Sequence, residues 1–443
     1  MNKYKIGLIS LGCDKNRIDS EIILGTLDTK YKIVNNPEEA DILIVNTCGF
    51  IESSKEESIN TILEMAKHKK QNCKMLMVTG CLSQRYSKEL HKLIPEIDVM
   101  LGVNDYDKIE EYINNFFNSN DKICICEYSN SKINEGKRIL TTPKHTAYIR
   151  ISEGCNNFCT YCIIPQIRGK YRSRAMNLII EEAKNLVHNG VKEIILVGQD
   201  TTIYGIDLYQ ENKLPELIRK LSEIDGIEWI RLLYSYPEEI TDELINEISN
   251  NKKVCNYLDI PIQHISNTVL KRMNRKSSKE LITKNILKMR NKISDLCIRT
   301  SIIVGFPGET DEEFNELKQF ISDIKFDKLG VFKYSQEEGT PASKMQNQVE
   351  ENIKELREQE LMLLQQKISK ENNSNRIGKK YKVLIEGKKD DYWFGRSYEM
   401  APEIDGLIFF KCDNILNIGE FINILTTDAL EYDLIGVVYH ESC

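Results

Sequence analysis

The spacing of six of the thirteen cysteines constrains this chain more than any other feature of its sequence. Three of the six, Cys155, Cys159 and Cys162, follow a C-x3-C-x2-C pattern, in which three thiolates can wrap one cuboidal iron-sulfur cluster. No further cysteine follows within reach to bind the fourth iron. A structural zinc site is the alternative, but zinc prefers four protein ligands and usually pairs two C-x-x-C arms. The pattern therefore predicts a cluster with one iron open to a small molecule.

The other three cysteines, Cys13, Cys48 and Cys81, share one sequence context. Each lies at the end of an apolar run that indicates a buried strand, and a helical pattern follows each one. Repeated strand–helix units predict a parallel sheet, and ligands gather beyond the carboxyl ends of its strands. A single cysteine in such a place is usually a small buried hydrophobe. Three in equivalent places favour a second cluster with an open iron.

Length and composition set wider bounds. A chain of 443 residues suggests about three domains, and 41% hydrophobic residues is ordinary for a soluble globular protein. We find no apolar run long enough to span a bilayer and no cleavable leader, so we expect a cytoplasmic protein. The odd cysteine count and the missing leader favour reduced thiols, which iron ligation requires.

Seven further cysteines have no spacing that defines a site. Cys124 and Cys126 lie two residues apart, and on a strand they would share a face, so we expect them to pack. The seven are Cys73, Cys124, Cys126, Cys255, Cys297, Cys412 and Cys443.

Changes in pattern divide the chain into four segments. Residues 1–117 alternate strand and helix, and residues 118–144, rich in Asn, Ser and Lys, read as a linker. Residues 145–372 hold six strand–helix units, which suit a partial barrel, and a charged helix over 350–372. Residues 373–443 hold short strands without helices between them, which predicts a small antiparallel β-barrel that binds rather than reacts. The strands of the partial barrel are predicted near 147–151, 193–197, 229–233, 257–260, 298–304 and 329–334.

The second cysteine group, with Tyr161 just before its third member, resembles the radical S-adenosylmethionine (SAM) superfamily. The resemblance implies that the open iron chelates the amino and carboxylate groups of SAM. It also implies that an injected electron breaks the sulfonium bond to give a 5'-deoxyadenosyl radical.

The whole chain resembles one branch of that superfamily, the methylthiotransferases. Their plan is a flavodoxin-like N-terminal domain with three cluster cysteines, a radical SAM partial (βα)6 barrel and a C-terminal TRAM barrel that binds the substrate. The two cysteine groups and the predicted terminal barrel carry the resemblance. It implies a transferase of sulfur-containing groups with two 4Fe-4S clusters, one on each group of three cysteines, and with SAM as cofactor.

Longer stretches of sequence indicate one group within the methylthiotransferases. These stretches are similar to the sequences of the enzymes that modify the β-carbon of an aspartate in small-subunit ribosomal protein uS12. Enzymes that act on adenosine in tRNA usually carry a Ser-Gly segment where this chain has Gln263-His264-Ile265. The similar stretches are SLGCDKNRIDSE, RISEGC, IPQIRGKYRSR, GQDTTIYG, LLYSYPEEI and YLDIPIQHIS.

The charge of the chain bears on the choice of substrate. Residues 376–443 carry eight Lys or Arg and twelve Asp or Glu, a net of −4, and the whole chain stands at −7. An acidic barrel should repel RNA and attract a basic ribosomal protein. Methylation and sulfur insertion on a tRNA adenosine remain the alternative within the enzyme class, with direct RNA contact left open. An iron-sulfur electron-transfer protein and an RNA-binding module are the alternatives from other classes.

The aspartate substrate that the resemblance implies determines the type of reaction that the enzyme needs. The β-carbon of aspartate carries unactivated C–H bonds that no side-chain base can deprotonate at useful cost, so a carbon radical is expected. Under the resemblance, the group at Cys155 cleaves SAM, the group at Cys13 delivers sulfur, and a second SAM supplies the methyl group. An electron donor and a sulfur donor are then needed as partners, and no membrane is involved.

Several other residues are candidates for contact with SAM or substrate. Tyr161 either lies against the adenine or simply excludes solvent. Gln199 and Asp200 follow the second predicted barrel strand, and Gln263 and His264 follow the fourth, where ligand contact and a turn role are both open. Gly305 and Gly308, in IIVGFPGET, are expected to let the backbone approach SAM. Arg168, Arg172 and Arg174 are expected to meet the SAM carboxylate, the substrate aspartate or solvent.

Overall fold

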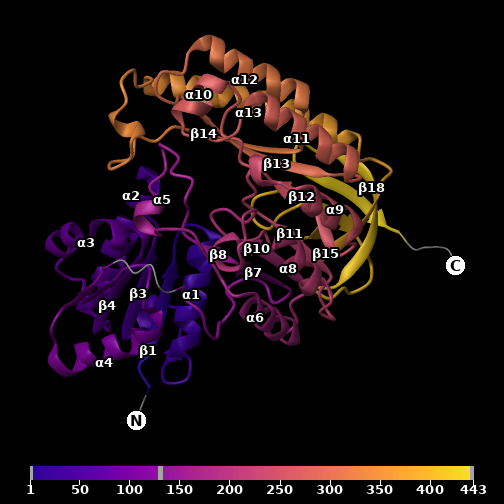
Figure 1. Ribbon diagram of the computed structural model, residues 1–443. Coiled ribbons are helices and arrows are strands. Elements are labelled where there is room, and N and C mark those ends of the chain that lie inside the picture. The colour runs from indigo at the N-terminus through magenta and orange to yellow at the C-terminus, as the bar shows by residue number, and fades with distance from the viewer. Residues whose placement is uncertain (1–2, 128–132, 440–443) are drawn as a thin grey trace.

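The computed structural model describes residues 3–127 and 133–439, and Cys443 lies outside them. Figure 1 shows an N-terminal α/β part, a central part built on a second sheet, and a C-terminal barrel. This architecture confirms the predicted mixed α/β class with a partial barrel and a small terminal barrel. Among the described residues, no helix combines the length and the apolar character needed to cross a membrane.

The first sheet has six parallel strands in the order β2-β1-β3-β4-β5-β6. Every residue of β3 and β4 is buried, because helices cover both faces of the sheet. Helices α1 and α4 pack on one face, and α2 and α3 pack on the other. The strands are β1 (Lys5–Ser10), β2 (Lys32–Ile33), β3 (Ile42–Thr47), β4 (Met75–Gly80), β5 (Val99–Leu101) and β6 (Ile123–Ile125). The helices are α1 (Asp14–Leu27), α2 (Glu52–Ala66), α3 (Cys81–Leu93) and α4 (Ile109–Ser119).

This sheet continues into the segment predicted as a linker, because β6 pairs with β5 at the sheet edge. The packing predicted for Cys124 and Cys126 holds only for Cys126, which lies against the core between α2, α3 and the sheet. Cys124 is exposed, since an edge strand leaves part of its surface open to solvent.

The central sheet also has six parallel strands, in the order β14-β13-β12-β11-β10-β7, and it does not close. Each predicted barrel strand appears within a few residues of its expected place. The strands are β7 (Thr146–Arg150), β10 (Glu193–Val197), β11 (Trp229–Leu232), β12 (Val254–Asp259), β13 (Cys297–Val304) and β14 (Lys328–Lys333), and the small pair β8 (Ser152–Glu153) and β9 (Arg172–Ser173) lies apart. The helices are α5 (Ile164–Ile167), α6 (Met176–His188), α7 (Ile206–Tyr209), α8 (Leu214–Ser222), α9 (Asp242–Asn250), α10 (Asn267–Arg272), α11 (Lys279–Lys292) and α12 (Asp311–Ile324).

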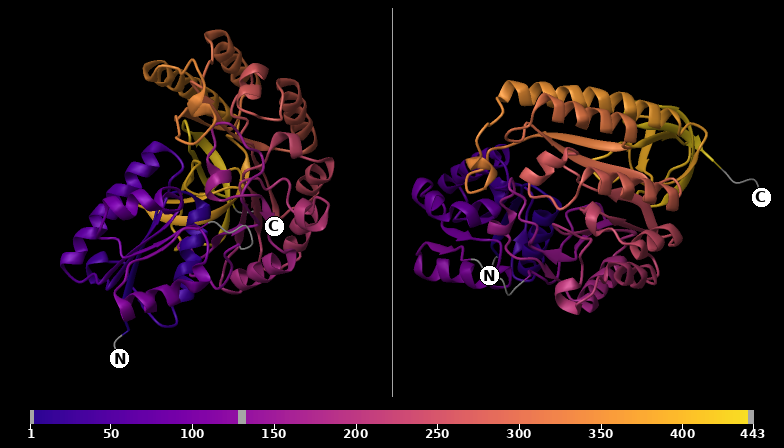
Figure 2. Two further views of the ribbon diagram at one scale, coloured as in Figure 1. Left: turned by 60° about the vertical axis from the view of Figure 1, so that its left-hand side comes forward. Right: turned by 45° about the horizontal axis from the view of Figure 1, so that its top comes forward.

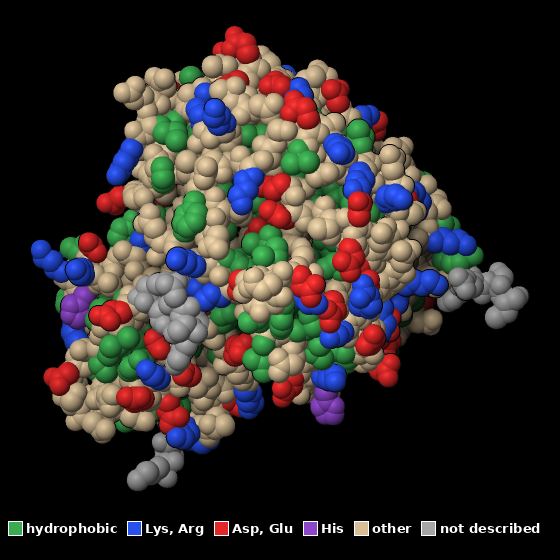
Figure 3. Space-filling model, viewed as in Figure 1, with side chains coloured by type: hydrophobic (Ala, Val, Ile, Leu, Met, Phe, Trp, Pro, Cys, Tyr) green, Lys and Arg blue, Asp and Glu red, His purple; other side chains and the backbone are tan. Residues whose placement is uncertain are grey.

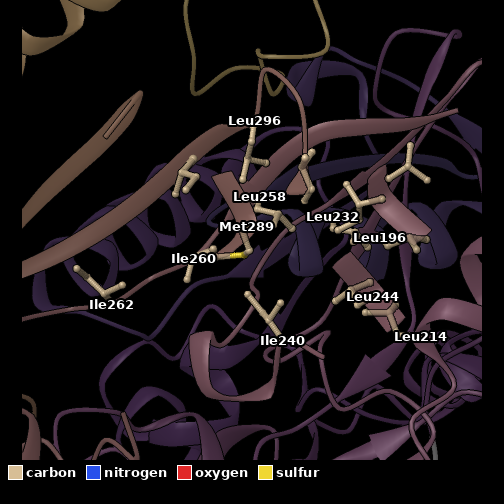
Figure 4. Close-up of a cluster of buried hydrophobic side chains, with 14 of the residues drawn as sticks. Leu196, Leu214, Leu232, Ile240, Leu244, Leu258, Ile260, Ile262, Met289 and Leu296 are labelled. Atoms are coloured by element: carbon tan, nitrogen blue, oxygen red, sulfur yellow. The ribbon is translucent and has the colours of Figure 1, made fainter. Parts of the chain in front are cut away.

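Apolar side chains hold the outer helices onto this sheet. Figure 4 shows Leu196 and Leu232 from the strands facing Leu214, Leu244 and Met289 from the helices. These side chains are at most 1% exposed. Burial of each such side chain contributes about 1.5–3 kcal/mol, so this layer stabilises the packing of the helices on the sheet.

The inner face of the partial barrel is covered by the other two parts of the chain. Tyr148 and Tyr257 on the inner face share one buried cluster with Ile18 of α1 and Leu384 of the terminal barrel. Charged groups join the same contact, because Glu193 at the start of β10 binds Arg231 at 2.9 Å and Arg396 at 2.5 Å. The three parts therefore share a common interface.

The C-terminal barrel is closed by five strands in the order β15-β16-β17-β19-β18. Four neighbouring pairs are antiparallel, as predicted, while β17 and β19 run parallel. A closed ring with an odd number of strands cannot alternate direction throughout, so one pair has to be parallel. The strands are β15 (Lys380–Lys389), β16 (Tyr392–Arg396), β17 (Ile408–Lys411), β18 (Phe421–Ala429) and β19 (Leu434–Val438).

A single long helix, α13 (Glu351–Ser374), connects the central sheet to the barrel, as predicted over 350–372. Near its start, Lys354 donates to the carbonyl of Tyr334, which directly follows β14 (3.1 Å). Near its end, Asn373 donates to the carbonyl of Leu430 in the barrel (3.1 Å). Figure 2 shows this helix running along one side of the central part to the barrel.

Candidate functional site

The first group of cysteines lies at one edge of the N-terminal sheet. Cys13 follows β1, Cys48 follows β3 and Cys81 follows β4, and these three strands are neighbours in the sheet. Cys13 is exposed and the other two are buried. Gly12 fits between them, because a Cβ at this position would lie 2.7 Å from Cys48 Cβ and 3.0 Å from Cys48 Sγ. We call Cys13, Cys48 and Cys81 the first triad.

The thiols of the first triad interact electrostatically. The pKa of Cys81 is raised to about 12, first by burial and further by Cys13 and Cys48, while Arg168 opposes the rise. Burial also raises the pKa of Cys48, and Cys13 adds to it. The thiols of Cys48 and Cys81 are therefore neutral at pH 7, and each loses its proton when a metal binds it as the thiolate.

The second group, Cys155, Cys159 and Cys162, lies in the loop that follows β8, and we call it the second triad. The amide of Cys155 donates to Gly169 O and that of Cys162 to Cys159 O, both at 3.0 Å, which fixes the ends of the loop. Burial raises the pKa of Cys155 to about 11, and Cys159 adds to the rise. Burial also raises the pKa of Cys162, and Cys159 makes the next largest contribution there.

Both triads have thiol donors and a positive neighbour, which fits an anionic iron-sulfur cluster. Arg168 lies beside the first triad, and Arg275 lowers the pKa of Cys162 in the second. Within residues 3–127 and 133–439, no three Cys, His, Asp or Glu side chains are gathered around a point where a single metal ion would sit. In a cuboidal cluster each thiolate binds a different iron, so the three sulfurs need not meet at one point.

A buried set of charged side chains lies between the triads. Arg168 Nη1 contacts Asp19 Oδ2 at 2.8 Å and Glu153 Oε2 at 3.1 Å. Arg150 Nη1 binds the other oxygen of Asp19 at 2.8 Å and Glu153 Oε2 at 2.9 Å. Burial alone would raise the pKa of Glu153, but Arg168 and Arg150 outweigh it and hold the pKa at about 2. We call these four residues the inter-triad network.

Sequence reasoning placed Arg168 toward ligand or solvent, and the structure buries it in the inter-triad network. Arg174 is likewise buried, where it donates to Arg150 O at 2.8 Å and binds Glu182 at 2.7 Å. Arg172 donates to the carbonyl of Lys170 at 2.7 Å. Neither Arg168 nor Arg174 therefore faces open solvent.

Tyr161 packs against a buried cluster that includes Met273, Phe306 and Tyr334. Burial raises its pKa well above the usual value, and the thiol of Cys159 adds to this. Its ring thus lies among apolar side chains beside the second triad, in keeping with the solvent-excluding alternative.

Gln199 and Asp200 are brought to the second triad. Gln199 Nε2 donates to Glu153 Oε1 at 3.1 Å, and Gln199 Oε1 is buried without a protein partner. Asp200 accepts from the Thr202 amide at 3.0 Å, which is the predicted turn role, and from Asn157 Nδ2 in the cysteine loop at 3.1 Å. The unpartnered oxygen of Gln199 is free to accept from a bound ligand.

Gly305 and Gly308 both have positive φ, 70° and 75°, so their backbone conformation favours glycine. At Gly305 a Cβ would meet Lys354 Cγ at 2.2 Å, so a side chain of α13 already covers this position. At Gly308 the nearest atom is Arg272 Nη1 at 3.5 Å. His264 is fully buried 3.9 Å from Glu309, and its Nδ1 accepts from Ser266 N at 3.0 Å.

Sequence reasoning missed several residues that the structure places at the site. Asn16 and Asp19 lie three residues apart on α1 and are fully buried, although charged residues are usually exposed on such helices. Arg150 and Glu153 directly precede the second triad in RISEGC, and charged residues at the end of an apolar strand were the available signal. Arg275 stacks on Tyr236 with its guanidinium carbon 4.3 Å from the ring centroid.

Comparison with protein families agrees with the three parts of the fold. Residues 149–321 match the radical SAM superfamily, residues 377–438 match the TRAM domain, and residues 5–102 match the uncharacterized protein family UPF0004. The fold also resembles the radical S-adenosylmethionine methyltransferase TsrM from Kitasatospora setae, with a TM-score of 0.57 and 11% identity. That match covers 77% of this chain and 74% of the other, and it supports the fold alone.

Curated relatives are similar over the whole chain. "Ribosomal protein uS12 methylthiotransferase RimO" of Clostridium novyi (strain NT) is 71% identical, covering 100% of both chains. The protein of that name from Clostridium tetani is 60% identical over the same coverage. The fold and these matches define a radical SAM transferase. Within that class, the chain belongs to the RimO family of ribosomal protein uS12 methylthiotransferases.

Proposed function

We propose that this enzyme adds a methylthio group to the β-carbon of an aspartate in ribosomal protein uS12. The observation that carries the proposal is the placement of two thiol triads on either side of one buried network, in a chain 71% identical to a uS12 methylthiotransferase. We assign the six cysteines of the triads as ligands of two 4Fe-4S clusters. Gln199 and Gly308 are assigned to contact SAM at the second triad, Tyr161 is assigned to exclude solvent from it, and Gly305, which Lys354 covers, is assigned to the turn that leads to Gly308.

Residues of the chain itself prepare the reaction. When both triads hold 4Fe-4S clusters, the second supplies the electron that cleaves SAM and the first supplies sulfur. Tyr161 and its apolar neighbours exclude water from the second triad, which protects a reactive carbon radical. Gln199 offers an acceptor oxygen to a ligand while its amide is fixed on Glu153. An electron donor and a sulfur donor complete the cycle, and a ribosomal substrate places the reaction in the cytoplasm.

Domain boundaries form part of the same proposal. We divide the chain into a methylthiotransferase domain at 1–117, a linker at 118–144 that adds the edge strand β6 to the sheet of that domain, a radical SAM core with its trailing helix at 145–372 and a TRAM domain at 373–443. The ranges matched by the three family models, 5–102, 149–321 and 377–438, support this division.

The surface charge supports a basic protein as substrate. Figure 3 shows acidic and basic side chains interspersed on one face, without a continuous basic stripe. The chain as a whole has a formal net charge of −7. A surface of this kind gains little from phosphates and attracts a basic ribosomal protein.

Mass analysis of cells with and without the gene tests the substrate. Intact-mass and peptide analysis of small-subunit ribosomal proteins should show a methylthio group on a uS12 aspartate that is lost with the gene. Nucleosides from tRNA, analysed in parallel, should not change. Loss of a methylthio-adenosine with uS12 unchanged would overturn the proposed substrate, and complementation with the intact gene and with Cys159→Ala provides the matched control.

A further inference from the structure

The inter-triad network joins the first triad to the loop of the second through buried hydrogen bonds and ion pairs. Its four charged side chains, Asp19, Arg150, Glu153 and Arg168, are each at most 7% exposed. Two positive and two negative charges balance, which limits the cost of removing them from water. Apolar side chains could fill this space at lower cost, so the charges call for a reason beyond packing.

Arg168 uses its two guanidinium nitrogens for different partners. Nη1 is held by the carboxylates of Asp19 and Glu153. Nη2 instead donates to Asn16 Oδ1 at 2.6 Å and lies 3.5 Å from Cys81 Sγ. The edge of the guanidinium that faces the first triad is therefore aimed at a sulfur.

Glu153 connects the same arginine to the second triad. It lies two residues before Cys155, and its Oε1 accepts from the Gly154 amide at 3.1 Å and from Gln199 at 3.1 Å. Its Oε2 is the atom bound by Arg168. One buried path of hydrogen bonds thus leads from Cys81 to the backbone next to Cys155.

We propose that Arg168 is a positioning residue that fixes the spacing of the two triads and sets the reduction potential of the cluster on the first. This inference rests on the proposed function, because it takes both triads to bind clusters. A donor and a positive charge beside a cluster sulfur favour the reduced, more negative cluster. Lysine can restore the positive charge at this position but not the spacing of the triads, since one ammonium cannot hold the carboxylates and the sulfur together.

The sharpest test compares a substitution that removes a positive charge from the network with one that removes a negative charge. In a background with Cys155, Cys159 and Cys162 changed to Ala, only the first triad holds a cluster after anaerobic reconstitution. An EPR-monitored redox titration then measures its midpoint potential. Arg168→Met should shift the potential to more negative values, and Glu153→Gln should shift it to more positive values. Arg168→Lys should return the potential toward that of the parent.

The spacing role is measured in the chain with both triads intact. The ratio of 5'-deoxyadenosine formed to uS12 modified should rise severalfold in Arg168→Met and in Arg168→Lys. Arg219→Lys is the matched control, because Arg219 is half exposed and its partners are Glu243 and Glu247 on the outer helix α9. Arg219→Lys should leave the midpoint potential, the iron content and the ratio of 5'-deoxyadenosine formed to uS12 modified at the values of the parent.

The outcomes separate the alternatives. Shifts of the same sign in Arg168→Met and Glu153→Gln, or no shift in either, would overturn the electrostatic role. Lower thermal stability with unchanged potential and ratio would show that Arg168 only supports the fold. If uS12 is not modified by the parent enzyme, the proposed function fails, yet the opposite shifts in potential still test the role of Arg168. Should Arg168→Met not fold, Glu153→Gln and Arg168→Lys carry the test.

Discussion

At the scale of single residues, the six triad cysteines are assigned distinct roles that can be separated. Cys159→Ala should abolish 5'-deoxyadenosine formation, because the second triad would lose one of its three thiolates. Cys48→Ala should spare SAM cleavage and stop sulfur insertion, because it removes a thiolate from the first triad only. Chromatographic measurement of 5'-deoxyadenosine and mass analysis of uS12 check both. Equal loss of cleavage in the two variants would contradict this division of labour, and Cys73→Ala serves as a control outside both triads.

Gly12 is predicted to protect the first triad by having no side chain. Gly12→Ala places a Cβ 2.7 Å from Cys48 Cβ at a φ of 83°, so Cys48 has to move. Iron bound at the first triad should fall, measured per chain in the background that lacks the second triad.

Gly190→Ala is the matched control for this variant. Its φ is 99°, but no atom lies within 4 Å of the added Cβ. Both variants should lose about 1 kcal/mol of stability from backbone strain, and only Gly12→Ala should lose iron. Equal iron content in the two variants would show that Cys48 adapts without cost to binding.

The cysteines of the site could be predicted from the sequence, whereas the inter-triad network could not, and the difference has a physical reason. The cysteines were predictable because their spacing is local and because strand ends share one edge of a parallel sheet. The inter-triad network was not, because Asp19 and Arg168 are 149 residues apart in sequence. A pairing of that kind arises when two domains meet, and no local pattern indicates it.

At the scale of elements, strands that are buried on both faces were the easiest to predict. All six residues of β3 are buried, and its sequence ILIVNT reads as a continuous apolar run. The edge strand β6 lies in the segment that was predicted to be a linker, because it is three residues long and partly exposed. The parallel β17–β19 pair follows from closing five strands, which only the complete barrel shows.

The docking of the terminal barrel should depend on pH through Glu193. Burial would raise its pKa, but Arg396 and Arg231 outweigh this and lower it from 4.5 to about 2. Because the pKa is lower in the folded state, the stabilisation is present above pH 4.5 and is lost as the pH falls toward 2. The difference corresponds to about 3 kcal/mol.

Trp229 reports on this contact, because its ring packs edge-on against Phe421 of the barrel with centroids 4.9 Å apart. The chain has two tryptophans, so Trp393→Phe leaves Trp229 as the single reporter. Its fluorescence should change between pH 4.5 and 2 in the parent. Glu193→Gln should show reduced stability already at pH 7 and no such transition. A transition of unchanged size in Glu193→Gln would assign the acid response to other groups.

At the scale of the whole molecule, a net charge of −7 should guide a basic partner to the enzyme. Charged surfaces attract across roughly 8 Å at 0.15 M ionic strength, and added salt screens this attraction. The association rate with purified uS12 should fall about tenfold or more between 50 and 500 mM NaCl, measured by stopped-flow. Bulk tRNA should bind more weakly than uS12 at each salt concentration. A rate that does not change with salt, or tighter binding of tRNA, would contradict this.

Helix α13 sets a length scale for whatever the barrel binds. From Lys354 beside the carboxyl end of the central sheet to Asn373 on the barrel, its axis rises about 29 Å. An extended peptide needs about nine residues to cover that distance. A helix of fixed length, rather than a flexible tether, thus connects the barrel to the residue that follows the last strand of the central sheet. A partner held at the barrel end of this helix therefore needs a projecting segment of about that length to reach its other end.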